Sequence, residues 1–371
     1  MAAIYDTDWL YKSKIIVHHT AISSDLTDFP VYVRLSDAPS EFFTNVLSAG
    51  EDVRLVREDG LECAFDLVFI STGSSTGELH FKAPLLSNSS DTIFWLVYGN
   101  ANASAYLATD TYGSQNVWTN GFIYVNHMQS ITGGDSVGNG GVATGVNSPT
   151  IVAGKLAGNA IEFNGTSQYM THPDFAELAG IGDLGISGWL YSRDYVNSRT
   201  VVGQVSLTGT SNRSLWLQVH SSVGASLYGS EDGGGSRDSA VEEGHVTSLV
   251  ENQWQHFIGW YDLSTSNSSK NHKIYIDGVE DTAFIENGDG SITDTNNSSA
   301  DLIIARLGGY GRYWDGYLDE LRIFDAQRSD AWMAAEHTNQ NTPTSFYTFG
   351  PQELNTNDAG TSIINQSTWF M

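Results

Sequence analysis

Cysteine is almost absent from this sequence, because Cys63 is the single one among 371 residues. A lone cysteine cannot form an intrachain disulfide, so core packing must hold the fold together. Cys63 lies in the apolar-rich run 62–65, where no neighbouring base would activate its thiol. We therefore expect a buried cysteine and not a catalytic one.

Basic residues are also scarce, with 17 Lys and Arg against 43 Asp and Glu, which gives a net charge of −26. Binding to nucleic acid or to an anionic membrane needs clustered Lys and Arg, so neither is expected. No apolar run approaches the roughly 18 residues of a membrane span, and the first residues lack the basic and apolar regions of a signal peptide. The sequence predicts no membrane insertion, and either retention in the cell or export by another route. Prior removal of a signal peptide is the alternative.

Short strands dominate the first hundred residues. Six segments are rich in apolar residues, several of them alternating with polar ones as in a strand with one buried face. They are residues 14–17, 31–35, 53–56, 65–69, 79–82 and 93–98. Turn residues separate these segments, so we expect a small β-sandwich over residues 1–106.

A region rich in Gly, Ser, Thr and Asn follows, and we expect a linker and a long polar loop over residues 107–150. Strand patterns resume at Ala160 and continue to Phe324. The pair Asp277-Gly278 within them is a hairpin-turn signal. A second all-β domain is therefore expected over residues 151–350.

The end of the chain differs in character. Ser329 and Asp330 are helix N-cap residue types and precede a helix-forming run at 331–336. Residues 351–371 are polar apart from their last three, so a polar C-terminal tail is expected there.

Five segments of the second half resemble, in order, strands of the laminin-G-like, concanavalin A-like jelly roll. They are residues 159–165, 186–190, 253–257, 274–278 and 314–323. The resemblance implies two antiparallel sheets, and domains of this kind commonly bind glycans or protein surfaces, some through calcium. The expected fold class is all-β: a small N-terminal β-sandwich, then a concanavalin A-like jelly-roll β-sandwich with one short helix near the C-terminus.

The N-terminal region carries a second resemblance. Residues 9–12, 26–31 and 52–55, with Tyr98-Gly99-Asn100 and Val117-Trp118, are similar to an uncharacterised microbial β-domain family that often precedes such jelly rolls. The similarity covers about residues 5–125. This family has no assigned chemistry, so the site residues are sought in the second half.

An enzyme would need a catalytic constellation. A retaining glycoside hydrolase needs two carboxyl groups about 5–5.5 Å apart, and Asp319 and Glu320 are the nearest candidates. Adjacent strand residues point to opposite faces, so these two cannot form such a pair with each other. Glu242-Glu243 lies in a Gly- and Ser-rich stretch typical of a solvated loop. No nucleophile elbow, zinc-protease helix, Walker loop or CxxC pair is present, so the sequence predicts no enzymatic activity.

A structural Ca²⁺ would take carboxylate and carbonyl oxygens that converge from loops. The candidate ligands are Asp315, Asp319, Glu231, Asp232 and Asp289. No stretch follows an EF-hand pattern, and Asp315-Gly316 and Asp289-Gly290 also fit tight turns. The ten histidines are scattered, and we expect no metal role for the pair His18-His19.

Glycan binding uses aromatic faces that stack on sugar rings and planar polar groups that pair with hydroxyls. The most suggestive stretch is a Gly-rich loop with two arginines and two tyrosines: Arg306, Tyr310, Arg312 and Tyr313. Trp216 and His220 are added as residues of a strand that lines one sheet face. The alternative is that the loop packs on its own domain.

These features together predict a non-catalytic binding or adhesion protein with a lectin-like jelly roll. We expect a homo-oligomeric virion component, such as a phage head fibre, spike, decoration or tail-associated protein, made in the host cytoplasm. Its partners would be host-surface glycans, and other virion proteins bound through the N-terminal domain or the C-terminal tail. The alternatives are a secreted, extracellular carbohydrate-binding module, a polysaccharide-degrading hydrolase, or a purely structural role.

Overall fold

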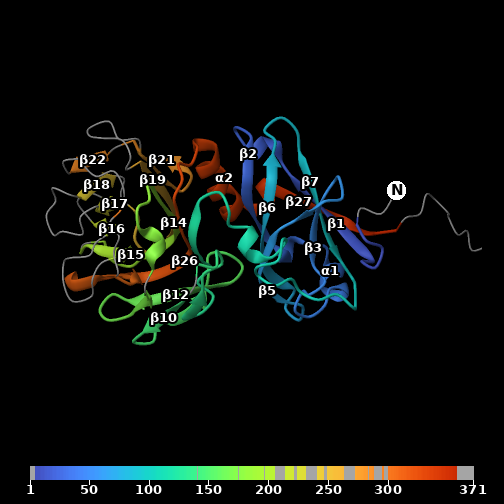
Figure 1. The fold of residues 1–371 in the computed structure, drawn as a ribbon, viewed down its shortest axis with the longest axis horizontal. Coiled ribbons are helices and arrows are strands. Elements are labelled where there is room, and N and C mark those ends of the chain that lie inside the picture. The colour runs from blue at the N-terminus through green and yellow to red at the C-terminus, as the bar shows by residue number, and fades with distance from the viewer. Residues whose placement is uncertain are drawn as a thin grey trace, which may run out of the picture.

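The computed structural model describes most of the chain. The described residues are 5–139, 141–173, 175–195, 197–204, 214–220, 224–230, 240–245, 249–262, 272–282, 284–287, 295 and 300–356. Strands predominate in these ranges, which confirms the all-β prediction. Figure 1 shows two β-rich halves side by side, the first built mainly from the N-terminal third of the chain, with helix α2 between them.

The N-terminal half is a sandwich of two antiparallel sheets. One sheet has the order β27-β1-β7-β3-β4 and the other β2-β6-β5. Their strands are β27 (Tyr347–Leu354), β1 (Tyr11–Val17), β7 (Thr92–Tyr98), β3 (Arg54–Arg57), β4 (Glu62–Cys63), β2 (Leu26–Arg34), β6 (Thr76–Leu86) and β5 (Phe65–Ser71). Alternate residues of each strand, such as Leu79 and Phe81 of β6, enter the shared core, and Cys63 is buried at its edge as expected.

The C-terminal half is a larger sandwich. Its nine-stranded sheet has the order β22-β18-β17-β16-β15-β23-β13-β10-β9, and its eight-stranded sheet is β11-β12-β26-β14-β19-β20-β21 with β8 also paired to β26. The nine-stranded sheet contains β22 (Phe284–Asn287), β18 (Ala240–His245), β17 (Gly224–Ser230), β16 (Leu215–His220), β15 (Arg199–Gln204), β23 (Leu302–Ile304), β13 (Tyr169–His172), β10 (Val142–Val146) and β9 (Thr132–Gly134). The other sheet contains β11 (Thr150–Ala153), β12 (Asn159–Asn164), β26 (Asp315–Phe324), β14 (Asp183–Ser192), β19 (Trp254–Asp262), β20 (His272–Ile276), β21 (Val279–Glu280) and β8 (Phe122–Asn126). A small hairpin is formed by β24 (Arg306–Leu307) and β25 (Arg312–Tyr313).

The helices are short, and one of them joins the two halves. They are α1 (Ser40–Asn45), α2 (Asp330–Asn341) and α3 (Pro343–Phe346). Ser329 caps α2 by accepting a hydrogen bond from the backbone N–H of Trp332, which confirms the predicted helix start. Trp332 and Met333 of α2 enter the core of the N-terminal sandwich, and Trp260 and Phe324 of the jelly roll join the same apolar cluster. The core of the N-terminal sandwich therefore extends across the interface, while the jelly roll keeps a separate core of its own.

The expected boundaries between segments differ from the observed ones. Strand β27 pairs with β1, so residues 351–354, which were expected in the polar tail, belong to the N-terminal sandwich. The region 107–150 carries β8, β9 and β10, which pair within the jelly roll, and is not simply a linker. Strand pairing between distant segments depends on tertiary contacts that local residue patterns do not report.

In the part of the chain that the structure describes, no helix combines the length and the apolar character that crossing a membrane would require.

Candidate functional site

Four of the six predicted glycan residues lie on a hairpin next to the nine-stranded sheet, and the other two lie in β16. Arg306 pairs with Tyr313, and Gly311 takes a left-handed conformation at the turn, with φ 61°. Tyr310 at the tip is 40% exposed. The guanidinium of Arg306 lies 4.9 Å from the ring centre of Tyr169 and 5.2 Å from that of Tyr313, and that of Arg312 lies 5.2 Å from Tyr310. We call residues 306–313 the aromatic hairpin.

Contacts with the sheet below hold the aromatic hairpin in place. Nη1 of Arg312 donates to Oε1 of Gln218 at 2.8 Å, and Nη1 of Arg199 donates to the carbonyl of Tyr313 at 3.0 Å. Leu307 packs on Trp216. We expected a Gly-rich loop here, with packing on its own domain as the alternative, and the structure shows a short hairpin anchored on that domain.

The side chain of Trp216 is buried beneath the aromatic hairpin and is not exposed to solvent. Its indole is 6% exposed and stacks on the ring of Tyr228, with centroids 4.5 Å apart and planes at 13°. Because the ring is covered, it cannot stack on a sugar, and its selection as a direct glycan contact was wrong. The backbone of His220 lies in β16, but its side chain is outside the described part of the structure, and so are the calcium candidates Glu231, Asp232 and Asp289. The backbone of Glu242-Glu243 forms part of β18 and not a loop.

Asp315, another calcium candidate, faces two arginines. Its Oδ1 lies 3.3 Å from Nη1 of Arg193, and its Oδ2 lies 3.9 Å from Nη2 of Arg199. These guanidinium groups also pair with Glu162 and Asp194. Two positive charges at the carboxylate oppose a cation there, which argues against Asp315 as a calcium ligand.

Asp319 is buried between the two halves and does not lie on a surface loop. Its side chain is 1% exposed, and Oδ2 accepts backbone hydrogen bonds from Lys155 at 2.8 Å and Leu156 at 3.1 Å. Burial, together with the nearby charge of Glu320, raises the pKa of Asp319 to about 8. A buried carboxyl that already accepts two backbone hydrogen bonds, away from any surface loop, is a poor calcium ligand, so the structure does not support this assignment.

A β-bulge brings Asp319 and Glu320 to the same face of β26. Gly188 of β14 stands opposite the two residues Glu320 and Leu321, and Glu320 has φ 52°. Leu318, Leu321 and Ile323 therefore enter the jelly-roll core, while Asp319, Glu320 and Arg322 point away from it, toward the N-terminal sandwich. The expectation that the two acids face opposite sides was wrong because it assumed unbroken alternation.

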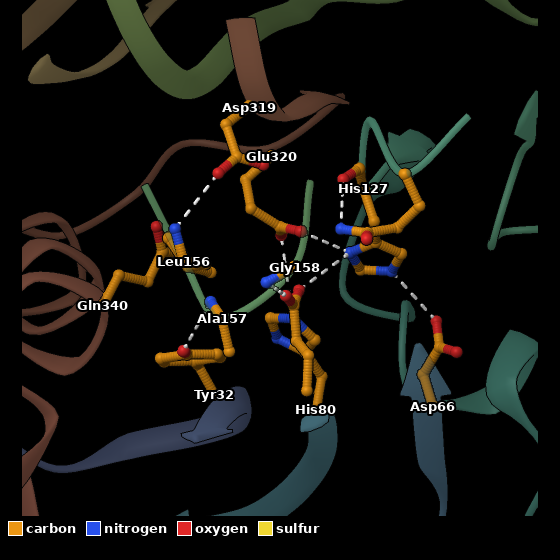
Figure 2. Close-up of polar contacts among 12 residues, drawn as sticks. Tyr32, Asp66, His80, His127, Leu156, Ala157, Gly158, Asp319, Glu320 and Gln340 are labelled. Atoms are coloured by element: carbon orange, nitrogen blue, oxygen red, sulfur yellow. Dashed lines mark hydrogen bonds and ion pairs between the residues drawn. The ribbon is translucent and has the colours of Figure 1, made fainter. Parts of the chain in front are cut away.

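Four metal-ligating side chains meet at this interface. Glu78 and His80 come from β6, Glu320 comes from β26, and His127 directly follows β8. One ligand atom from each lies within 4.8 Å of all the others. Nδ1 of His127 is 2.5 Å from Oε1 of Glu320, and Nε2 of His80 is 3.3 Å from Oε1 of Glu78. We call these four residues the interdomain cluster, which Figure 2 shows in part.

A second layer of contacts fixes the interdomain cluster. Oδ2 of Asp66 lies 3.1 Å from Nε2 of His127 and accepts a hydrogen bond from the indole of Trp118 at 2.9 Å. The backbone N–H of Gly158 donates to Oε2 of Glu78 at 3.1 Å. Nη2 of Arg322 donates to Oε2 of Glu320 at 2.7 Å. Figure 2 shows Asp66 on one side of the His127 ring and Glu320 on the other.

The charges of the interdomain cluster are strongly coupled. Burial alone would lower the pKa of His127, but Glu320 and Asp66 outweigh it and raise that pKa well above its usual value. Burial lowers the pKa of His80 to about 3, so this imidazole is neutral. Burial and the charge of Glu320 raise the pKa of Glu78 well above its usual range. Burial therefore favours the uncharged forms of Glu78 and His80, whereas Glu320 and His127 favour each other's charged forms.

Sequence reasoning missed the interdomain cluster, although one signal was present. Glu78 and His80 alternate with Leu79 and Phe81 on β6, so the sequence alone predicts that Glu78 and His80 lie on the same face of this strand. Their partner residues lie about 50 and 240 positions further along the chain, and no local pattern connects them. The bulge that turns Glu320 toward them is equally invisible in the sequence.

Comparisons with known proteins found solved structures that resemble part of the chain. Three solved structures among those similar in fold are domain 4 of the extracellular arabinanase AbnA from Geobacillus stearothermophilus, in complex with arabinotriose, and the binding domains of botulinum neurotoxin serotypes D and G. Their sequence identities are 17%, 12% and 13%, and their TM-scores are 0.44, 0.45 and 0.44. The matches cover 58%, 62% and 60% of this chain and 97%, 53% and 51% of those chains, so the chain spans about half of each neurotoxin domain.

No curated protein matches the chain. Residues 164–334 match the family model described as the concanavalin A-like lectin/glucanases superfamily. This match confirms the resemblance of the second half, whereas the resemblance of residues 5–125 stays a prediction.

Proposed function

We propose that this chain is a non-catalytic, lectin-like carbohydrate-binding protein that contacts glycans through the aromatic hairpin. The observation that carries the proposal is Tyr310, 40% exposed at the tip of an anchored hairpin on a domain of a lectin-containing superfamily. The ring of Tyr313, on the same hairpin, lies 6.3 Å from that of Tyr169. Arg306 and Arg312 add planar donors that suit sugar hydroxyls.

The outer face of the nine-stranded sheet forms the floor of this surface. Leu215, Leu217 and Val219 of β16 enter the core, so the alternate residues Trp216 and Gln218 lie on the opposite face. Gln218 bonds Arg312, and Trp216 supports Leu307. The aromatic groups are thus held in place before a ligand arrives, which reduces the entropy cost of binding.

The non-catalytic part of the proposal is supported by the position of Asp319 and Glu320. Each is 1% exposed and covered by the N-terminal sandwich, so a polysaccharide cannot reach this carboxylate pair in the closed structure. Glycans incubated with the protein should release no new reducing ends. Release that is abolished by Asp319→Asn or Glu320→Gln would instead support the hydrolase alternative.

The direct test is binding of the purified full chain to a glycan array, with and without calcium. We expect saturable binding to a defined polysaccharide, at least tenfold weaker in Tyr310→Ala. The matched control is Leu107→Ala, which removes a 69% exposed side chain from a loop outside the jelly roll and should leave binding unchanged. Binding that both variants retain in full would refute the hairpin as the contact surface.

The setting we propose is a virion surface, with a homo-oligomer attached to the particle through its N-terminal sandwich. The arrangement of the fold supports this orientation, because β1 and β27 lie at the end of the molecule away from β16 and β17 (Figure 1). If the end with β1 and β27 is attached to the particle, the end with β16 and β17 faces outward. Detection of the chain in purified particles would support the virion setting, and isolation of a free extracellular form would support the secreted alternative.

A further inference from the structure

The interdomain cluster has the ligand types and spacing of a transition-metal site. The ligand atoms of Glu78, His80, His127 and Glu320 lie within 4.8 Å of one another. Nδ1 of His127 lies 3.9 Å from Oε1 of Glu78, and Nε2 of His80 lies 3.7 Å from Oε2 of Glu320. Four ligands about 2.0–2.2 Å from a tetrahedral ion are roughly 3.4 Å apart, so only small side-chain shifts separate this arrangement from Zn²⁺ coordination.

His127 is oriented as metal-ligating histidines usually are. Asp66 holds its Nε2 at 3.1 Å, which leaves Nδ1 directed at Glu320 and Glu78. A carboxylate on the far nitrogen fixes the ring and raises its basicity as a ligand. Trp118 in turn donates to Asp66 at 2.9 Å, so the orienting group is itself held.

His80 presents its Nε2 to both carboxylates of the interdomain cluster. Its side chain is fully buried, and Nε2 lies 3.3 Å from Oε1 of Glu78 and 3.7 Å from Oε2 of Glu320. These contacts are long for hydrogen bonds, and a lone pair on Nε2 between two carboxylate oxygens is placed to bind a cation.

The buried interface also carries more carboxyl groups than guanidinium groups. Five carboxyl side chains are buried there, namely Asp66, Glu78, Asp319, Glu320 and Glu336, against two guanidinium groups, Arg322 and Arg328. Burying ionised carboxylates without compensation is unfavourable, so protons, the imidazole of His127 or a bound cation must balance them. A divalent cation between Glu78 and Glu320 would provide this balance when both carboxyl groups are ionised.

We propose that Glu78, His80, His127 and Glu320 bind a divalent transition-metal ion, Zn²⁺ in the first instance, that links the two halves of the molecule. Glu78 and His80 belong to the N-terminal sandwich, whereas Glu320 and the β8 extension bearing His127 belong to the jelly roll. Two imidazoles with two carboxylates suit Zn²⁺, while Ca²⁺ takes six to eight oxygen ligands. The site is separate from the aromatic hairpin and does not depend on glycan binding.

The test uses the purified full chain, stripped with a chelator and then exposed to Zn²⁺, Mn²⁺ or Ca²⁺. We expect one tightly held Zn²⁺ per chain by native mass spectrometry and elemental analysis, with a rise in Tm of about 3 °C or more. In Glu78→Gln and His127→Gln, the bound Zn²⁺ should fall below one tenth per chain. His19→Gln, which alters a surface histidine 2.6 Å from Asp91, is the matched control and should keep full loading.

A second measurement covers the case in which a variant fails to fold. Co²⁺ added to the stripped wild-type chain should give the intense visible absorption of a four-coordinate site, and equimolar Zn²⁺ should displace it. Failure of the wild-type chain to retain Zn²⁺, or loading abolished by His19→Gln alone, would overturn the proposal. In that event the interdomain cluster is a hydrogen-bonded network in which protons compensate the buried charge.

Discussion

Glu336 provides the sharpest test of how the two halves are held together. It lies on α2 with 2% of its surface exposed. Its Oε1 lies 3.3 Å from Nη1 of Arg322 and 3.6 Å from Nε2 of His256. The indole of Trp332 donates to Oε2 at 3.3 Å. Burial by itself would raise the pKa of this carboxyl, but the charge of Arg322 and the contact with His256 lower it to about 2.

The contribution of Glu336 to the free energy of unfolding can be calculated from this shift in its pKa. A fall from 4.5 to about 2 corresponds to about 3 kcal/mol of stability, because each pKa unit is worth about 1.4 kcal/mol. The folded pKa lies below the unfolded one, so the contribution is complete above the unfolded pKa, near 4.5, and is lost as the pH falls toward 2. About 1 kcal/mol should be gone at pH 4 and about 2 kcal/mol at pH 3.

The perturbation is Glu336→Gln, which keeps the shape of the side chain and removes its charge. We expect the free energy of unfolding at pH 7 to fall by about 3 kcal/mol, since a buried guanidinium loses a partner. Denaturant unfolding curves for both chains at pH 7, 4 and 3 should converge as the pH falls. The control is Glu58→Gln on the exposed 58–60 turn, where we expect less than about 0.5 kcal/mol at each pH. A difference between wild type and Glu336→Gln that is the same at all three pH values would refute the electrostatic reasoning.

Three further predictions concern the fold. A chain that ends at Phe346 loses β27 and its pairing with β1, so it should expose the N-terminal core and bind a hydrophobic dye, whereas one that ends at Thr356 should not. Gly316→Ala should destabilise the jelly roll by several kcal/mol in unfolding experiments, because φ is 142° and the added Cβ would lie 1.8 Å from the carbonyl of Tyr191. Trp216→Ala should lower Tm through loss of a buried side chain, while Tyr310→Ala should leave Tm within about 1 °C and affect only glycan binding.

Local patterns in the sequence were enough to predict the class of fold. Alternation along β6 and the turn at Asp277-Gly278 each depend on neighbouring residues only, and both occur as expected. Ser329 predicted the start of α2 correctly, because a helix N-cap is a contact between residues three positions apart and is therefore also local. The pairing of β27 with β1 joins segments that are more than 300 residues apart, and no local pattern in Tyr347–Leu354 predicts which strand it pairs with.

The site could be predicted only in part, for a related reason. The aromatic hairpin is continuous in sequence, so its tyrosines and arginines could be identified from composition alone. Whether a given aromatic is exposed depends on what covers it, and Tyr228 and Leu307 cover Trp216 from other segments. The interdomain cluster combines three separate segments with a bulge, so it could be found only in the folded chain.

The position of the N-terminal sandwich also determines which surface of the jelly roll can bind a ligand. A jelly-roll sandwich has two outer sheet faces, and here Asp319, Glu320 and Arg322 on the eight-stranded sheet are covered by the N-terminal half and α2. The outer face of the nine-stranded sheet is not used in this way, and it is the face that carries the aromatic hairpin. Polar side chains that another lectin-like fold could offer to a ligand are therefore used in this chain to join its two halves. A glycan-binding surface on this protein should accordingly respond to changes in the aromatic hairpin and be insensitive to charge-neutral substitutions at the interface that leave the chain folded.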